Sequence, residues 1–499
     1  MQTVDCLLKT MPSYPYFCRN HQSFLKKFLK SAFFISVGGA LPLLSGLVLL
    51  IPYTQNLSLT LYGELAIFIS FTLFVQILMN YGVDTYLSVH YYDHTENTKL
   101  NYFLRSVSGL LIMNGLVLII LFSGIGYFLF QFIFPDGDIP FFPFGFMSVV
   151  TAFFNSYFRT YVNLQVFGDK PIKYFLFGLF NFAATVAISL TLIYQYPFEL
   201  TGPMWGRFLS GVLIFLLTLF YSWKEFGISF RVPFFNELRN YTTPIVLFSL
   251  LTWVLGYINN FILKGLSSSA DVGVYNFTIT CTLLIEYASL GLLSTINPRI
   301  YKLWKSKSIR ESSMEENKYN HVFSAFNILM IAINILILPF IIRFFIKEDF
   351  HASIEFIPII CASFVFRGLY NTLINPLYYF KKTQVLPKIL LISAIIQVVS
   401  GIILIKYFGI WGAVWSYFLV KPVQLIFIWQ ESKKVFTFHF NLFKMVFMPI
   451  LYCLTVILLS QIGNLTEIQV VVIQMVTALI LVAFGYRREL WELKKVFSA

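Results

Sequence analysis

Apolar residues in this 499-residue sequence gather in long runs that are separated by short polar segments. A helix needs about 20 apolar residues to cross the roughly 30 Å hydrocarbon core of a bilayer. Fourteen runs reach that length, so the pattern predicts an all-α polytopic membrane protein with about fourteen transmembrane helices. The spans are expected at about residues 29–51, 61–81, 106–134, 141–167, 172–194, 202–222, 241–263, 272–296, 322–346, 354–379, 385–405, 410–429, 442–461 and 468–484.

The composition excludes the main soluble classes of protein. Hydrophobic residues make up 58% of the chain and charged residues 12%, about half the share that a soluble domain carries. So few charges cannot cover a water-facing surface of this size. A soluble enzyme, a nucleic-acid-binding module and a disordered scaffold are therefore excluded, and the net charge of +13 needs another explanation.

The distribution of Lys and Arg supplies that explanation. If the N-terminus is cytoplasmic, 28 of the 36 cationic residues fall in cytoplasmic segments, four in the opposite loops and four within spans. Cytoplasmic loops of membrane proteins carry such an excess of Lys and Arg. Both termini are therefore predicted to lie in the cytoplasm.

The segments outside the spans leave no room for a soluble catalytic domain. The longest internal loop is at residues 302–320. Residues 1–28 lack a cleavage site after an apolar core, so they are interpreted as a basic amphipathic segment and not as a cleaved signal peptide. Residues 486–499 have apolar positions at helical spacing and are expected to lie flat on the inner leaflet. The five cysteines form no CxxC pair, which indicates neither a disulfide framework nor a metal site.

The two halves of the chain repeat one another at an offset of 206 to 210 residues. Six spans per repeat is an even number, so both repeats have the same orientation, and the pseudo-two-fold axis runs along the membrane normal. Matched tryptophans alone could reflect interfacial belts, but three pairings in the same order favour a repeat. The pairs are Trp205-Gly206 with Trp411-Gly412, Gly63 with Gly273, and Phe158-Arg159 with Phe366-Arg367.

The repeat divides the chain into two six-helix lobes and a C-terminal helix pair. The N-lobe is predicted at residues 29–222 and the C-lobe at 241–430, joined by a cytoplasmic linker at 223–240. Residues 431–485 hold helices 13 and 14. Parallel repeats of this kind usually enclose a cavity that opens alternately to each side of the membrane.

Spans ordered as six, six and two resemble the polysaccharide-exporter branch of the multidrug/oligosaccharidyl-lipid/polysaccharide (MOP) exporter superfamily. The segments LYGELAIFISFTLFVQILMNYGVDTYL, VGVYNFT and NPRIYKLW are similar to those of its O-antigen, or lipid-linked oligosaccharide, flippases. The resemblance extends from about Phe28 to the end of the chain. It implies a transporter and not an enzyme, placed in the bacterial cell (inner) membrane. The pathway would be lipopolysaccharide or other surface-polysaccharide biosynthesis, with polysaccharide polymerase and chain-length proteins as possible partners.

Ionisable residues within spans are costly to expose to lipid and are candidates for function. Five cations against one deep acid predict an electropositive interior, which suits an anionic group such as the pyrophosphate of a lipid-linked sugar. The candidate substrate-binding cations are Arg159, Arg207, Arg299, Arg367 and Lys421. The candidates for coupling or charge balance are Glu286, near the middle of its span, and Asp84, which follows the second span.

Each of these residues also has a structural interpretation. Arg159, Arg207 and Arg299 can snorkel to headgroups, whereas Arg367 and Lys421 are deep enough to pair with Glu286 or with freed carbonyls. Glu286 can bind a coupling proton or Na⁺, or can simply neutralise one arginine. Pro422, beside Lys421, is a hinge candidate because proline removes a backbone hydrogen bond.

Other motifs indicate no further chemistry. Asp136-Gly-Asp138 matches a DxD pattern but is better explained as a turn. His90 and His94 have no third ligand nearby, so no metal site is predicted. The chain has no phosphate-binding loop, so it is not expected to hydrolyse ATP or to need a cofactor beyond a possible H⁺ or Na⁺ gradient.

The sequence thus favours a flippase that moves polyprenyl-diphosphate-linked oligosaccharide, such as an O-antigen unit, to the outer leaflet by alternating access. Two alternatives stay open. An ion-coupled drug or cation antiporter of the same superfamily would be expected to carry more deep acids. A membrane polysaccharide polymerase or ligase would need a large outer loop, and no outer loop here exceeds about ten residues.

Overall fold

The computed structural model describes residues 16–93, 96–306, 309–461 and 466–489 and is built from α-helices with short 3₁₀ and π turns. Fourteen helices in this part of the chain are long and apolar enough to cross a membrane. The predicted number of spans and the all-α class are therefore confirmed, and each predicted span overlaps one of these helices. The protein is a multi-pass membrane protein.

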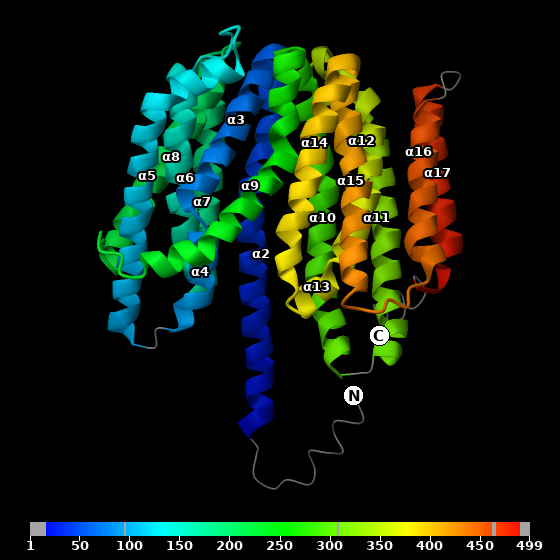
Figure 1. Ribbon diagram of the computed structural model, residues 1–499, viewed down its shortest axis with the longest axis horizontal. Helices are drawn as coiled ribbons and strands as arrows, with labels where there is room; N and C mark the ends of the chain where they lie inside the picture. The colour runs from blue at the N-terminus through cyan, green and yellow to red at the C-terminus, as the bar shows by residue number, and fades with distance from the viewer. Residues whose placement is uncertain (1–15, 94–95, 307–308, 462–465, 490–499) are drawn as a thin grey trace.

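In the described part of the first half, seven α-helices and a π-helical turn that leads into the fourth span are present (Figure 1). Their bounds are α2 Tyr16–Asn56, α3 Leu59–Asn80, α4 Val83–His90, α5 Asn97–Ile133, η2 Phe141–Gly145, α6 Phe146–Phe167, α7 Pro171–Gln195 and α8 Thr201–Glu225.

The second half has the same order of spans and ends with a pair of additional helices. Its elements are α9 Phe235–Leu266, α10 Ser269–Ser306, α11 Ile309–Phe345, η3 Glu348–Phe356, α12 Ile357–Leu373, α13 Asn375–Tyr379, α14 Leu386–Phe408 and α15 Ile410–Lys433. The pair is η5 Phe443–Phe447 with α16 Met448–Ser460, followed by α17 Glu467–Gly485.

The terminal segments are described only in part. α2 begins at Tyr16 and continues without a break into the first span, so half of the segment predicted at residues 1–28 is an extension of that span. Residues 1–15, and 490–499 of the predicted tail, lie outside the described part of the chain.

The helices of the two halves pack in the same order. α2 packs on α7, α7 on α8 and α8 on α6; correspondingly, α9 packs on α14, α14 on α15 and α15 on α12. The glycines matched by the sequence repeat allow two helices to pack closely in each half. A Cβ on Gly206 would lie 2.7 Å from the Cα of Ser189 on α7, and one on Gly412 would lie 2.1 Å from the carbonyl oxygen of Leu404 on α14. The two halves therefore share one packing plan.

The halves meet most closely where α3 crosses α10, at Gly63 and Gly273. A Cβ on Gly63 would lie 1.8 Å from the carbonyl oxygen of Ser269, and a Cβ on Gly273 would lie 2.3 Å from that of Leu59. Leu59 and Ser269 are themselves matched at the offset of 210 residues. Contacts between equivalent residues occur where a two-fold axis passes, so the pseudo-two-fold axis runs between these two glycines.

Around this crossing the halves are joined at one face of the molecule, which we call the closed face. Gln55 Nε2 donates to the carbonyl oxygen of Phe345, 2.6 Å away, and Lys264 Nζ lies 3.0 Å from Asp138 Oδ2. Toward the other end the helices of the two halves diverge (Figure 1). That end carries Lys99, Lys173, Arg239 and Lys434 among others, and we call it the basic face.

Helix α9 crosses from one half to the other (Figure 1). Its first turns lie in the predicted linker at 223–240, yet Leu238 is buried in a cluster with Tyr86 and Phe103 of the first half. Further along, Trp253 Nε1 donates to the carbonyl oxygen of Ser70 on α3, 2.8 Å away. α9 therefore closes one lateral seam between the halves.

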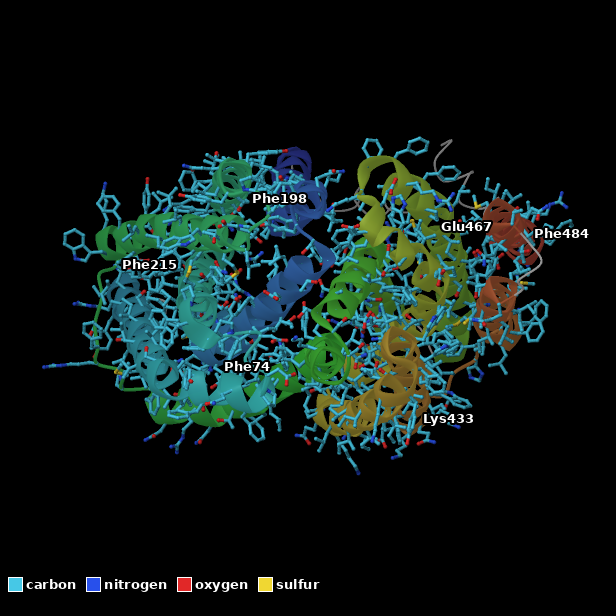
Figure 2. All side chains as sticks on the ribbon, turned by 90° about the horizontal axis from the view of Figure 1, so that it is seen from above. Phe74, Phe198, Phe215, Lys433, Glu467 and Phe484 are labelled. Carbon is cyan, nitrogen blue, oxygen red and sulfur yellow. The ribbon has the colours of Figure 1, made fainter. Side chains whose placement is uncertain are left out.

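The α16–α17 pair lies outside the repeat, at the edge that carries Glu467 and Phe484 (Figure 2). It packs on α11 and α12. At the basic face, Glu489 Oε1 lies 2.8 Å from both His321 Nδ1 and Lys444 Nζ, and its side chain is 8% exposed. Burial acts to raise the pKa of this carboxyl, but hydrogen bonds from Lys444 and His321 outweigh it and hold the pKa below its ordinary value.

Glu489→Gln is expected to lower the free energy of unfolding at neutral pH by about 1–2 kcal/mol, because it removes these charge-assisted bonds. A lowered carboxyl pKa stabilises above the unfolded value of about 4.3, and that stabilisation is lost as pH falls through the folded pKa. Thermal unfolding at several pH values checks this. The difference from the unaltered protein should vanish in acid, and Glu96→Gln, at an exposed pair with Lys99, should have little effect.

Gly63→Ala is expected to destabilise the closed face strongly, since the added methyl group overlaps a backbone oxygen that cannot move independently. The loss should reach or exceed the 1–3 kcal/mol typical of overpacking. Gly124→Ala on α5 is the matched control because nothing lies within 4 Å of its Cβ position. Thermal unfolding of the two variants provides the measurement, and equal melting temperatures would contradict the packing argument.

Candidate functional site

A cavity of about 840 Å³ lies between the two halves. It extends from Tyr62 near the closed face to Asn375 and Tyr378 near the basic face. Most of its lining comes from α2, α3, α9, α10, α12 and α15. The close α3–α10 crossing limits it at one end, and the divergence of the halves widens it at the other.

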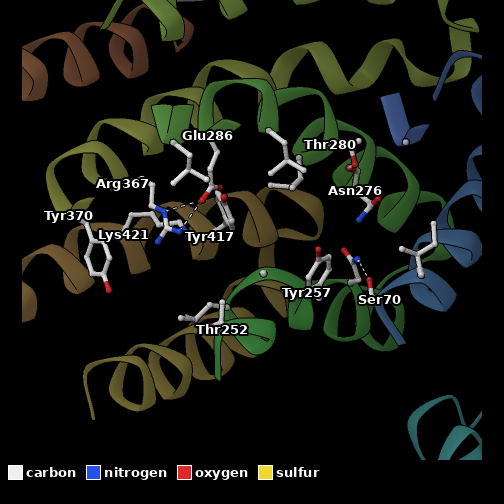
Figure 3. A pocket seen from close by; sticks show the side chains of 18 of the residues that line it. Ser70, Thr252, Tyr257, Asn276, Thr280, Glu286, Arg367, Tyr370, Tyr417 and Lys421 are labelled. Atoms are coloured by element: carbon white, nitrogen blue, oxygen red, sulfur yellow. Dashed lines mark hydrogen bonds and ion pairs between the residues drawn. The ribbon is translucent and has the colours of Figure 1, made fainter. Parts of the chain in front are cut away.

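An ion pair between Glu286 of α10 and Arg367 of α12 lies in the wall of this cavity (Figure 3). Glu286 Oε1 is 2.9 Å from Arg367 Nη2 and 3.3 Å from Arg367 Nε. The guanidinium carbon also lies 5.6 Å from the centre of the Tyr370 ring. The Arg367 side chain is 33% exposed, so it still faces the cavity while Glu286 holds it in place.

Two more cations line the cavity. Lys421 of α15 places its Nζ 4.4 Å from the centre of the Tyr417 ring, a cation–π contact, and Arg207 lies on the wall formed by α8. Among the described residues that line the cavity, Glu286 is the only acid. Three cations against one carboxylate give the lining a net positive charge.

The structure brings four of the predicted site residues together and leaves the others elsewhere. Arg207, Glu286, Arg367 and Lys421 line the cavity, and Pro422 follows Lys421 inside α15. The pairing of Arg367 with Glu286 is one of the alternatives that the sequence left open.

Arg159, Asp84 and Arg299 do not line the cavity. Asp84 Oδ2 is 3.1 Å from Arg159 Nε, and the Arg159 side chain is 65% exposed. Thr160 Oγ1 also donates to Asp84 Oδ1 across 2.6 Å. These residues form a polar cluster on the first half, in which Asp84 pairs with Arg159 and accepts from Thr160. Arg299 is exposed on α10 beyond the cavity lining, as its position near the end of a span allows.

The neutral polar lining was missed by sequence reasoning. Amide and hydroxyl side chains interrupt the apolar runs of α9, α10 and α12, and this interruption was the available signal. The residues are Ser70, Thr252, Tyr257, Asn260, Asn276, Thr280, Asn297, Asn371, Asn375 and Gln424.

The Asp136-Gly-Asp138 motif has a structural role. Gly137 has a φ of 72°, which is typical of a turn. Asp138 accepts the bond from Lys264 described above. The motif therefore contributes to the closed face.

The fold is that of known membrane transporters. The lipid II flippase MurJ, solved in an inward closed conformation, superposes with a TM-score of 0.70 at 15% identity, covering 92% of this chain and 98% of that one. An inward-facing multidrug resistance MATE family transporter of the MOP superfamily gives 0.67 at 12% identity, covering 78% and 94%. No family model and no curated protein sequence matches the chain.

A transporter solved in another conformation is also similar. An outward-facing MATE family transporter gives a TM-score of 0.52 at 13% identity, covering 82% of this chain and 95% of that one, lower than the inward-facing one.

The Glu286–Arg367 pair should behave as one unit in stability measurements. Glu286→Gln and Arg367→Gln should each lower the melting temperature, whereas the double variant should lose less than the sum, with a coupling energy of about 0.5–3 kcal/mol. The surface pair of Glu431, in the last turn of α15, and Lys434, just after it, is the control, where the coupling should stay below about 1 kcal/mol. Additive losses at positions 286 and 367 would show that the pair contributes nothing.

Proposed function

We propose that the protein is a flippase for a polyprenyl-diphosphate-linked oligosaccharide, such as an O-antigen or similar surface-polysaccharide unit. The observation that carries the proposal is the net positive lining of the cavity between the halves. Arg367 and Lys421 offer a planar guanidinium and a mobile ammonium, two groups that bind phosphate well. The shared fold with a lipid II flippase supports the same class of substrate.

The two lateral seams of the cavity differ, which supports a substrate with a lipid tail. α9 packs along α3 on one flank, but in the described part of the chain α2 and α10 form no comparable seam on the other. Gly46 of α2 and Leu290 and Ser294 of α10 line the cavity there, and all three are exposed. A headgroup can occupy the cavity from this flank while its polyprenyl chain stays among the lipids.

Transport would proceed by rocking of the two halves about the α3–α10 crossing. We propose that the basic face is cytoplasmic, in accord with the excess of Lys and Arg, and that the headgroup is released at the closed face once it opens, in a bacterial inner membrane. Glu286 would then compete with the substrate phosphate for Arg367. That competition would allow a proton or Na⁺ on Glu286 to assist loading.

The second candidate is an ion-coupled antiporter of cationic drugs. The observation that favours it is the carboxylate of Glu286 within the cavity, together with the shared fold of the MATE family transporters. In this case Glu286 would bind the drug or the coupling ion, and it would pair with Arg367 again once that ligand has left.

A transport assay separates the two candidates. In proteoliposomes, the protein should carry a fluorescent polyprenyl-diphosphate sugar between leaflets, and Lys421→Met should slow it at least about tenfold, as the loss of a charge-assisted contact predicts. Lys406→Met on the exposed end of α14, outside the cavity lining, is the control and should transport normally. Efflux of cationic dyes without movement of the lipid would support the antiporter instead.

A further inference from the structure

The polar lining of the cavity changes in character along α10. Glu286, with Arg367 and Lys421, marks a charged region, whereas Asn276 and Thr280 lie nearer the closed face with Ser70 and Tyr257 (Figure 3). Thr280 and Glu286 are six positions apart, which is about 9 Å along a helix. The walls formed by α3, α9 and α10 are therefore neutral between the charged region and the closed face, while Arg207 of α8 lines the cavity beside Tyr53.

Asn260 of α9 shows that the neutral part of the lining is not fully satisfied by the protein itself. The residue is 1% exposed and its Nδ2 donates to Ser70 Oγ, 3.0 Å away. Its Oδ1 is buried without a hydrogen-bond partner. Turning the amide over would only exchange the two atoms, so one polar atom stays unpaired. Leaving a buried polar atom unpaired is unfavourable, and a ligand bound in the cavity can supply the missing hydrogen bond.

The preceding residue provides a direct comparison. Asn259 has the same side chain on the same helix, but it does not line the cavity. Its Oδ1 accepts from Gln397 Nε2 at 2.9 Å, and its Nδ2 donates to Ser416 Oγ at 2.9 Å. Asn259 thus has hydrogen-bond partners for both its oxygen and its nitrogen, whereas Asn260, which lines the cavity, has an oxygen without a partner.

The groups around Asn260 have the chemistry that recognises sugars. Asn276 and Asn260 supply amides, which can donate and accept at the same time, and Thr280 and Ser70 supply hydroxyls. Tyr257 adds an aromatic face with a polar tip, and its ring centre lies 6.3 Å from that of Trp253. A neutral polyhydroxyl group can use all of these contacts without the burial of an unpaired charge.

We propose that Ser70, Tyr257, Asn260, Asn276 and Thr280 form a subsite for the neutral sugar of the headgroup, which we call the glycan subsite. The inference rests on the proposed function, in which the diphosphate lies at Arg367 and Lys421. The sugar then lies between the phosphates and the closed face, so it faces the side on which it is to be released. Asn260 and Asn276 determine specificity for a glycosylated over a bare lipid diphosphate.

The test compares two probes bound to the purified full-length protein: a polyprenyl diphosphate, and the same lipid carrying one N-acetylglucosamine. The unaltered protein should bind the glycosylated probe at least about fivefold more tightly, the equivalent of one or two hydrogen bonds. Asn260→Ala and Asn276→Ala should reduce this ratio toward one while leaving the Kd of the bare diphosphate unchanged. Asn259→Ala should lower thermal stability but keep the ratio.

Lys421→Met separates this inference from the proposed function. It should weaken both probes equally, because it removes a contact with the phosphates. If Lys421→Met does so but the sugar adds no affinity, or Asn260→Ala weakens both probes alike, the glycan subsite is overturned and the flippase proposal stands. If neither probe binds the unaltered protein, or Lys421→Met has no effect on either, both are overturned.

Discussion

The close contact of Gly63 with Gly273 is the constraint on which the rest of the structure depends. It allows the backbones of α3 and α10 to touch where the pseudo-two-fold axis passes, and a side chain at either position would separate them. Because the halves are joined there, they can diverge only toward the basic face, and this divergence creates the cavity. The same two helices then carry polar groups into it, Ser70 on α3 and Glu286 on α10.

Electrostatics in the cavity follow from how few charges reach it. In a medium of low dielectric constant a charge acts over a longer distance than in water, so one carboxylate against three cations defines the sign of the whole region. Glu286 holds Arg367 in a fixed orientation, while Lys421 lies over the face of the Tyr417 ring. Arg367 is therefore preorganised by an ion pair, whereas Lys421 is held by a weaker cation–π contact.

The sequence allowed the fold to be predicted more completely than the site. Runs of apolar residues define spans whatever their neighbours are, and paired glycines such as Gly206 and Gly412 revealed the repeat because backbone contact tolerates no other residue. The site depends on helix rotation, which composition does not determine. Arg159 and Arg367 occupy equivalent positions of the repeat, yet only Arg367 pairs with an acid in the cavity wall, whereas Arg159 pairs with Asp84 outside the cavity lining. Asn260 and Asn276 were missed because an isolated amide in a span is a weak signal without its surroundings.

Helix α9 makes the two flanks of the cavity different, which the repeat alone would not do. Its first turns are buried in the first half, its remainder packs in the second, and Pro244 lies between these regions, where a backbone hydrogen bond is missing. A single continuous helix thus connects the two halves, and it must bend if they move relative to one another. Since α9 covers only one flank, the two flanks of the cavity are inequivalent, and under the proposed function a carried molecule would approach from the uncovered one.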